Sequence, residues 1–236
     1  KVMSREKLQT IYQYQSCGNE SPKWEGRCPS CSEWNTLIEV PKRSNRKGAW
    51  INSSPNASEE LSEIQHHASE RLDLELGEAN RVLGGGVVKG SMVLIGGDPG
   101  IGKSTLLLQL SNSLAGKNKN VLYVTGEEST HQIKLRADRL GITGKGIHVI
   151  SNTELSYIIH HMDLLSPALV IVDSIQSIST DDVDSGPGTI AQVRECALSL
   201  LRWAKTKDIP ILITGHVTKE GNIAGPKSLE HMVDVV

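Results

Sequence analysis

The sequence contains no phenylalanine, only four cysteines and no long hydrophobic run. Four cysteines among 236 residues are too few for a disulfide scaffold. No apolar stretch approaches the ~18 residues that a membrane-spanning helix needs. Residues 1–15 carry charges but lack the apolar centre of a signal peptide. The sequence therefore predicts a cytoplasmic protein that does not contact membranes, and nothing in it accounts for the missing phenylalanine.

The net charge is close to zero but is unevenly distributed. Twenty-five Lys and Arg stand against 27 Asp and Glu, which gives −2. Residues 1–49 hold nine basic and five acidic side chains, so they carry +4 and the remainder carries −6. The basic residues cluster at Lys42, Arg43, Arg46 and Lys47. Two interpretations stay open for this cluster, which either contacts phosphates or belongs to a solvated linker.

Composition divides the chain into three regions. Residues 1–40 contain three of the four cysteines and two tryptophans, and we expect them to form a small module. Residues 41–70 are rich in Pro, Ser, Asn, Lys and Glu, which predicts a linker with one short helix at 58–66. In residues 71–236, apolar runs alternate with helical patterns, which is typical of βαβ units around a mostly parallel sheet.

The expected strands of this α/β domain are residues 92–95, 121–124, 147–150, 169–172 and 211–213, and the expected helices are 104–114, 130–140, 155–165 and 189–205. Residues 234–236 read as part of a further strand. The last helix places six apolar residues on one face, which predicts that they lie in the core: Ile190, Val193, Ala197, Leu200, Leu201 and Ala204. Cys196 is expected to be a core residue as well.

The strongest motif follows the first of these strands. Residues 97–104 read Gly-Asp-Pro-Gly-Ile-Gly-Lys-Ser, which is the pattern G-x-x-x-x-G-K-[ST] directly before a helix. The glycines let successive backbone N–H groups point into one concavity, where the helix N-terminus adds partial positive charge. The motif predicts a site for the phosphates of ATP or ADP, formed by Gly97, Asp98, Pro99, Gly100, Ile101, Gly102, Lys103, Ser104 and Thr105.

Polar residues at the ends of the apolar strands supply the other parts of a hydrolytic site. Lys103 is expected to reach the β and γ phosphates, and the Ser104 hydroxyl to face Mg²⁺. Asp173 ends an apolar strand, where it either holds Mg²⁺ through water or caps a helix. Glu127, with Glu128 as the alternative, follows another strand and is expected to polarise the attacking water, although either could cap a helix instead.

His216 ends the last expected strand. At that place it is either a sensor of the γ-phosphate or an ordinary surface histidine.

The chain resembles a known family. Residues 72–236 are similar to the RecA-type ATPase core, on the evidence of Leu-Gly-Gly-Gly at 83–86, Lys-Gly-Ser at 89–91 and the Gly-Glu-Glu strand end. The whole chain resembles the RadA family of bacterial repair ATPases. The family's N-terminal module has the form C-x-x-C-G, W-x-G-x-C-P-x-C and a further Trp, which residues 17–18, 24–31 and Trp34 match here. Segments downstream of the module also resemble the family, at 183–188, 192–196, 215–221 and 224–226.

The resemblance implies a RecA-type P-loop core preceded by a small zinc-ribbon-like module. It also implies a DNA-dependent ATPase that forms a ring of six subunits and drives branch migration. The implied partners are single-stranded DNA, branched recombination intermediates and the recombinase RecA. The alternative is an ATP-gated ring that serves as a scaffold for other proteins. A small-molecule phosphotransferase is disfavoured, because no acceptor-binding constellation follows the phosphate loop.

The sequence departs from the family at the zinc module. The family's first zinc-binding Cys should stand three residues before Cys17, and that position is Tyr14. A structural zinc site needs four donors, and a phenol replaces a thiolate poorly. Cys17, Cys28 and Cys31 could bind Zn²⁺ weakly with water or with His66 or His67, or the site could stay empty.

The resemblance also suggests where DNA binds and how the family continues. In RecA-type cores the DNA contacts lie in two loops, which correspond here to residues 177–189 and 217–228. The first loop contains Asp181, Asp182 and Asp184, which repel phosphates, so Lys219 and Lys227 in the second are the better candidates. Family members continue into a Lys-Asn-Arg-Phe-Gly motif and a Lon-protease-like domain, so we expect this sequence to be an N-terminal fragment.

Overall fold

The computed structural model describes residues 10–14, 20–21, 23–29, 33–41, 71–117, 119–216 and 229–236. The chain divides into two compact units, residues 1–69 and 70–236. The helix predicted at 58–66 lies outside the described residues.

The first unit contains a small antiparallel sheet that sequence reasoning did not predict. Its strands are β1 (Thr10–Tyr14), β2 (Glu20–Ser21) and β3 (Leu37–Pro41), in the order β2-β1-β3. After β2, the Cys28 N–H donates to the Glu33 carbonyl (2.8 Å), and the Asn35 N–H donates to the Gly26 carbonyl (2.9 Å). Tyr14 and Cys28 are both buried in this unit.

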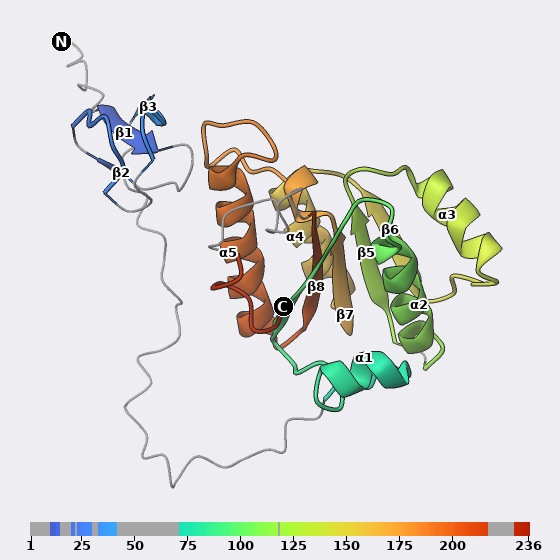
Figure 1. Ribbon diagram of the computed structural model, residues 1–236. Helices are drawn as coiled ribbons and strands as arrows, with labels where there is room; N and C mark the ends of the chain where they lie inside the picture. The colour runs from blue at the N-terminus through green and yellow to red at the C-terminus, as the bar shows by residue number, and fades with distance from the viewer. Residues whose placement is uncertain are drawn as a thin grey trace, which may run out of the picture. The chain divides into compact units, whose positions relative to one another are not determined.

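The second unit is built on a five-stranded parallel sheet (Figure 1). Its strands occur in the spatial order β4-β8-β7-β5-β6 and run over Met92–Gly97 (β4), Val121–Thr125 (β5), Ile147–Ser151 (β6), Leu169–Asp173 (β7) and Ile211–His216 (β8). All five predicted strands are confirmed, and so is the α/β class. Each strand extends past its predicted carboxyl end, because the sheet continues into polar and glycine residues that an apolar pattern does not detect.

Helices cover both faces of this sheet. One face carries α2 (Lys103–Ala115) and α3 (Thr130–Arg139), and the other carries α4 (Leu155–Leu165) and α5 (Ile190–Lys207) (Figure 1). These four helices confirm the predicted ones. The short helices α1 (Gly77–Val82) and η1 (Ile175–Ser177) were not predicted, because six and three residues are too few for an amphipathic pattern.

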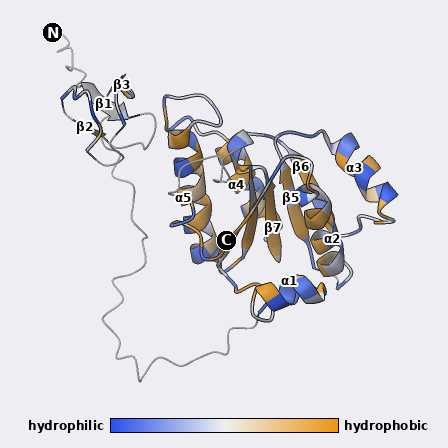
Figure 2. Cartoon of the chain, viewed as in Figure 1, coloured by the Kyte–Doolittle hydropathy of each residue, from blue (hydrophilic) through white to orange (hydrophobic). Residues whose placement is uncertain are grey.

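Each face of the sheet has its own hydrophobic core. Met92 and Leu94 point toward α4 and α5, whereas Val93 between them points toward α2. Figure 2 shows the strands as the most hydrophobic part of this unit. Fully burying one such side chain contributes about 1.5–3 kcal/mol. The predicted core face of α5 is confirmed at four of its six positions, which are fully buried, while the other two are half-buried.

Cys196 also lies fully buried in the core under α5, as predicted. Burial raises the pKa of its thiol to about 12. The thiol therefore stays protonated and unreactive at neutral pH.

The predicted strand at 234–236 is wrong in extent. Only Val235 makes a parallel bridge to Val93 of β4, with a hydrogen bond from the Leu94 N–H to the Val235 carbonyl (2.9 Å). The Asp234 side chain turns back instead, where it accepts a hydrogen bond from the Met92 N–H (2.8 Å) and pairs with Lys205. In the described part of the chain no helix has the length and apolar character required to cross a bilayer.

Candidate active site

The predicted site residues gather where the parallel strands end. The phosphate loop follows β4, Glu127 follows β5, Asp173 ends β7 and His216 ends β8. The register pairs Gly97 with His216, and Thr125 with Asp173. In open parallel sheets, ligands bind outside the carboxyl ends of the strands. The topology thus brings the predicted phosphate, metal and water-polarising residues to one edge.

The phosphate loop has the backbone shape that anion binding requires. Gly100 (φ 80°) and Gly102 (φ 108°) adopt left-handed conformations that strain any other residue. Gly102 is the N-cap of α2, and no side chain caps that helix end. Its first N–H groups are therefore available to an anion, as at other helix N-termini. Ser104 and Thr105 follow in the first turn and are half-buried.

The Lys103 ammonium is buried inside this loop. The residue is only 9% exposed, and its Nζ donates to the carbonyl oxygens of Gly97 (2.6 Å) and Asp98 (2.9 Å). Burying a charge is costly unless an opposite charge compensates it, and a carbonyl is neutral. A phosphate oxygen would provide that missing anion, so this environment fits a bound nucleotide.

The Asp173 carboxylate is held from both neighbouring strands. Tyr123 of β5 donates its hydroxyl to Oδ2 (2.8 Å), and Thr214 of β8 donates to Oδ1 (2.7 Å). Burial raises the pKa of Tyr123 well above its ordinary value, so its hydroxyl remains a donor. Each carboxylate oxygen has a second lone pair that can accept a proton from metal-bound water. This arrangement fits Mg²⁺ held through water.

The two adjacent glutamates have different surroundings. The exposed Glu127 accepts a hydrogen bond from the buried Ser174 hydroxyl (2.5 Å). Glu128 instead pairs with Arg136 of α3 (2.5 Å), and its side chain is 25% exposed. The Glu128 N–H also donates to the Thr125 hydroxyl (3.1 Å). Glu128 is therefore engaged on the α3 side, whereas Glu127 is held by the segment that follows Asp173.

Sequence reasoning missed Tyr123, Thr214 and Ser174. One signal was available, because a tyrosine inside the apolar strand Val-Leu-Tyr-Val needs a hydrogen-bond partner when it is buried. The partners of Thr214 and Ser174 depend on the order of the strands, which the chain pattern does not specify.

The two loops predicted to contact DNA differ in how far they are described. Lys219 and Lys227 lie in the segment 217–228, outside the described residues. The loop 177–189 is held by Gln192, a buried residue in the first turn of α5, whose side chain binds the loop backbone. Its Nε2 lies within hydrogen-bond distance of three carbonyls, those of Thr180 (2.9 Å), Val183 (3.0 Å) and Ser185 (2.7 Å), and its Oε1 accepts from the Thr180 N–H (2.9 Å). This acidic loop therefore has a defined shape.

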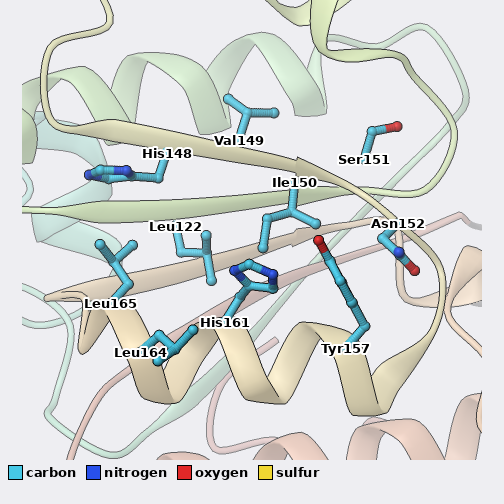
Figure 3. A pocket seen from close by; sticks show the side chains of 10 residues that line it. All are labelled: Leu122, His148, Val149, Ile150, Ser151, Asn152, Tyr157, His161, Leu164 and Leu165. Carbon is cyan, nitrogen blue, oxygen red and sulfur yellow. The ribbon is translucent and has the colours of Figure 1, made fainter.

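A separate cavity of about 530 Å³ lies between the edge strand β6 and α4 (Figure 3). Tyr157 and His161 project into it from α4, and Leu122 and Ile150 line it from the sheet. No residue of the phosphate loop contributes to its lining. The cavity is thus distinct from the predicted nucleotide site.

Tyr14 stands three residues before Cys17, where the family resemblance implies a zinc-binding cysteine. Its side chain is 0% exposed, and its hydroxyl lies within hydrogen-bond distance of the Glu25 carbonyl (3.2 Å) and the Arg27 carbonyl (3.1 Å), which share its single proton. Cys28, which directly follows Arg27, is buried as well. Cys17 and Cys31 lie outside the described residues.

Comparisons with known proteins agree with this architecture. The AAA domain family matches residues 58–222, and the rubredoxin metal binding domain family matches residues 12–39. The DNA repair protein RadA of Bacillus subtilis is 55% identical over 227 residues, which cover 94% of this chain and 50% of the relative. The DNA repair protein RadA of Listeria monocytogenes is 49% identical over 99% of this chain and 52% of the relative. That of Haemophilus influenzae is 45% identical over 95% of this chain and 50% of the relative.

The parallel sheet, the phosphate loop and the AAA domain match define a P-loop ATPase domain. The chain belongs to the AAA domain family and, within it, to the RadA group, as its motifs predicted. It spans about half the length of the curated relatives that it matches. An ATPase domain implies a bound nucleotide and Mg²⁺, which the loop and Asp173 fit.

The residues around Tyr14 do not fit a complete four-thiolate zinc site. Zinc ribbons take their ligands as two Cys-x-x-Cys pairs. Here the pair that includes Cys17 lacks its first thiolate, and the hydroxyl in its place already donates to backbone carbonyls.

We expect metal analysis of the purified chain to give well under one Zn²⁺ per chain. The substitution Tyr14→Cys should raise the zinc content, because it restores the fourth thiolate. Tyr14→Phe is the matched control, since it removes the same hydroxyl without adding a ligand, and it should leave the zinc content unchanged. Full occupancy with Tyr14 in place would show that another residue completes the site.

Proposed function

We propose that this chain is the ATP-hydrolysing part of a DNA repair and recombination protein of the cytoplasm, with a zinc-ribbon-like module (1–40), a linker (41–70) and a RecA-like ATPase domain (71–236). In this proposal single-stranded DNA stimulates ATP hydrolysis, which drives branch migration of recombination intermediates. The observation that carries the ATPase is the buried Lys103 ammonium, whose partners in the described residues are neutral carbonyls. The relatives' name, DNA repair protein RadA, supports the biological role.

The residues at the sheet edge have separate roles in the proposed hydrolysis. The loop 97–105 binds the phosphates through its backbone N–H groups, and Lys103 contacts the β and γ phosphates. Ser104 and Asp173 would hold Mg²⁺, which supplies positive charge against the phosphate oxygens when it is bound. Glu127 polarises the attacking water, and His216 senses the γ-phosphate from the strand beside the loop.

The contacts of the two glutamates support Glu127 rather than Glu128 as the water-polarising group. The Arg136 ion pair directs Glu128 toward α3. Glu127 is instead linked by Ser174 to the chain segment of Asp173. A carboxylate that acts on water beside Mg²⁺ belongs on that side.

DNA binding in this proposal depends on local positive charge. Residues 50–236 carry −6 in total, so the domain as a whole does not attract DNA. Lys219, Lys227 and the cluster at 42–47 are the candidate contacts. A ring of six copies repeats these weak contacts around one strand, and the summed binding becomes strong. The recombinase RecA is the proposed protein partner.

Replacing Lys219 and Lys227 together by alanine should weaken binding to single-stranded DNA and flatten its salt dependence. Each neutralised phosphate contributes about −0.7 to the slope of log affinity against log salt on single strands. The matched control removes two exposed lysines, Lys119 and Lys145, which precede β5 and β6 and so lie near the opposite edge of the sheet. Fluorescence anisotropy at several salt concentrations measures the slope.

Basal ATP hydrolysis should stay nearly intact in the Lys219 and Lys227 double variant. An unchanged DNA affinity and slope, at equal assembly state, would exclude the second loop as the contact. The cluster at 42–47 would then be the better candidate.

The rate of ATP hydrolysis with and without single-stranded DNA tests the proposed function. Single-stranded DNA stimulates a nucleic-acid motor, because such a motor couples ATP hydrolysis to its contacts with the DNA. A scaffold that only assembles with ATP shows the same rate in both conditions. Equal rates, under conditions where the chain binds the strand, would therefore favour the scaffold.

A further inference from the structure

We propose that Ser174 is the positioning residue for Glu127, and that its hydroxyl fixes the carboxylate which polarises the attacking water. This inference depends on the proposed role of Glu127. It assigns a function to a residue whose only distinction in the sequence is that it follows Asp173.

The first observation is the contact itself. The Ser174 hydroxyl donates to Glu127 Oε1 at 2.5 Å and joins two residues that are 47 positions apart in the chain. Ser174 is 1% exposed, whereas the Glu127 side chain extends from an exposed backbone position. A glutamate at an exposed position has several accessible rotamers. A hydrogen bond from a buried donor favours one of these rotamers and so defines where the carboxylate lies.

The second observation is that Ser174 is itself firmly held. It precedes the short helix η1, and its carbonyl accepts hydrogen bonds from the N–H (3.2 Å) and the hydroxyl (2.7 Å) of Ser177. The next residue, Ile175, is fully buried in the core between the sheet and the helices α4 and α5. The donor thus belongs to a packed segment, so it can define the place of a more exposed carboxylate.

The third observation is the close approach of the two strand ends. A Cβ atom on Gly126 would lie 2.1 Å from the hydroxyl oxygen and 2.5 Å from the Cβ of Ser177, so the absence of a side chain allows the contact. The Gly126 N–H also donates to the Asp173 carbonyl (3.3 Å). The residue before Glu127 is therefore docked on the same turn that carries Ser174.

These contacts join the two carboxylates of the site into one unit. Asp173 is held by Tyr123 and Thr214, and Glu127 is held by the residue that follows Asp173. A displacement of η1 would therefore move Glu127 relative to Asp173. The expected consequence is that loss of the Ser174 hydroxyl slows hydrolysis without weakening nucleotide binding, because neither the loop nor Lys103 contacts Ser174 in the described hydrogen bonds.

The test is the steady-state ATPase rate of Ser174→Ala together with its nucleotide affinity, measured with a fluorescent ADP analogue. We expect kcat to fall about 10-fold, as for the loss of a hydrogen bond to a charged group, with unchanged affinity. The matched control is Ser111→Ala. Ser111 is a fully buried serine of α2 whose hydroxyl donates to the Leu107 carbonyl (2.8 Å), and its substitution should leave kcat unchanged.

Two further variants separate positioning from a general loss of structure. Ser174→Cys keeps nearly the same volume but has a weak donor, so its kcat should fall between those of wild type and Ser174→Ala. If Ser174→Ala does not fold, the kcat of Ser174→Cys tests the proposal in its place. A wild-type kcat for Ser174→Cys would overturn the proposal. Combining Ser174→Ala with Glu127→Gln should add no further loss in single-turnover rate, because the hydroxyl acts through Glu127.

Wild-type kcat in Ser174→Ala, or an equal additional loss in the Glu127→Gln background, contradicts the positioning role. The proposed role of Glu127 is tested separately, by the Glu127→Gln variant alone. If Glu127→Gln alone turns over ATP like wild type, the assignment of Glu127 fails, whatever Ser174→Ala does.

Discussion

Replacing Lys103 by alanine is expected to abolish ATP hydrolysis and to weaken ATP binding. The substitution removes a buried ammonium from the phosphate loop, where it would face the charge that develops on the phosphates. Loss of one such electrostatic group costs about 10²–10³-fold in kcat. The affinity also falls, because Lys103 contacts phosphates that are present before the reaction. Calorimetric titration with Mg²⁺–ATP and a phosphate-release assay measure the two effects.

Lys119→Ala is a suitable control for the Lys103 variant, because it removes an exposed lysine of the same domain at a distance from the loop in sequence. Its ATP affinity and rate should equal those of wild type. Wild-type ATP binding by Lys103→Ala would show that the loop has been assigned wrongly.

Replacing Glu127 by glutamine should lower kcat by about 10²–10⁴-fold, the usual contribution of a general base. Nucleotide affinity should change little, because Glu127 is proposed to act on water and not on the phosphates. The glutamine keeps the size and the Ser174 contact but loses the negative charge. Rapid-quench single-turnover kinetics measure the rate of the chemical step, and calorimetry measures the nucleotide affinity.

Glu128→Gln is the matched control, since it makes the same chemical change one residue away. It should leave the chemical step nearly unchanged and lower the melting temperature, because it breaks the partly buried pair with Arg136. If Glu128→Gln instead eliminates hydrolysis while Glu127→Gln does not, the two roles are reversed.

The sequence was sufficient for the main features of the second unit. Its strands and helices carry distinct apolar patterns, and they occupy the predicted places. The short elements could not be predicted, because the six residues of α1 and the three of η1 are too few to show an amphipathic pattern. The small sheet of the first unit pairs residues distant in sequence, such as Thr10 with Pro41, and composition does not reveal that register.

The site could be predicted only in part. Lys103 belongs to the loop motif after β4, Glu127 stands just after β5 and Asp173 ends β7, so a motif and its context identify them. Their supporting partners come from other strands, since Tyr123, Thr214 and Ser174 meet them only through the order β8-β7-β5. That order is a property of the folded sheet. The different surroundings of Glu127 and Glu128 could not be predicted either, because they depend on where α3 places Arg136.

A crystal structure of the chain with Mg²⁺ and a non-hydrolysable ATP analogue tests the central claim most directly. We predict that the analogue lies at the loop 97–105, with Lys103 moved from the carbonyls of Gly97 and Asp98 to the phosphates. Mg²⁺ should lie between Ser104 and Asp173, and Glu127 should remain bound to Ser174. An analogue bound elsewhere, such as the cavity between β6 and α4, with Lys103 still on the two carbonyls, would contradict the account.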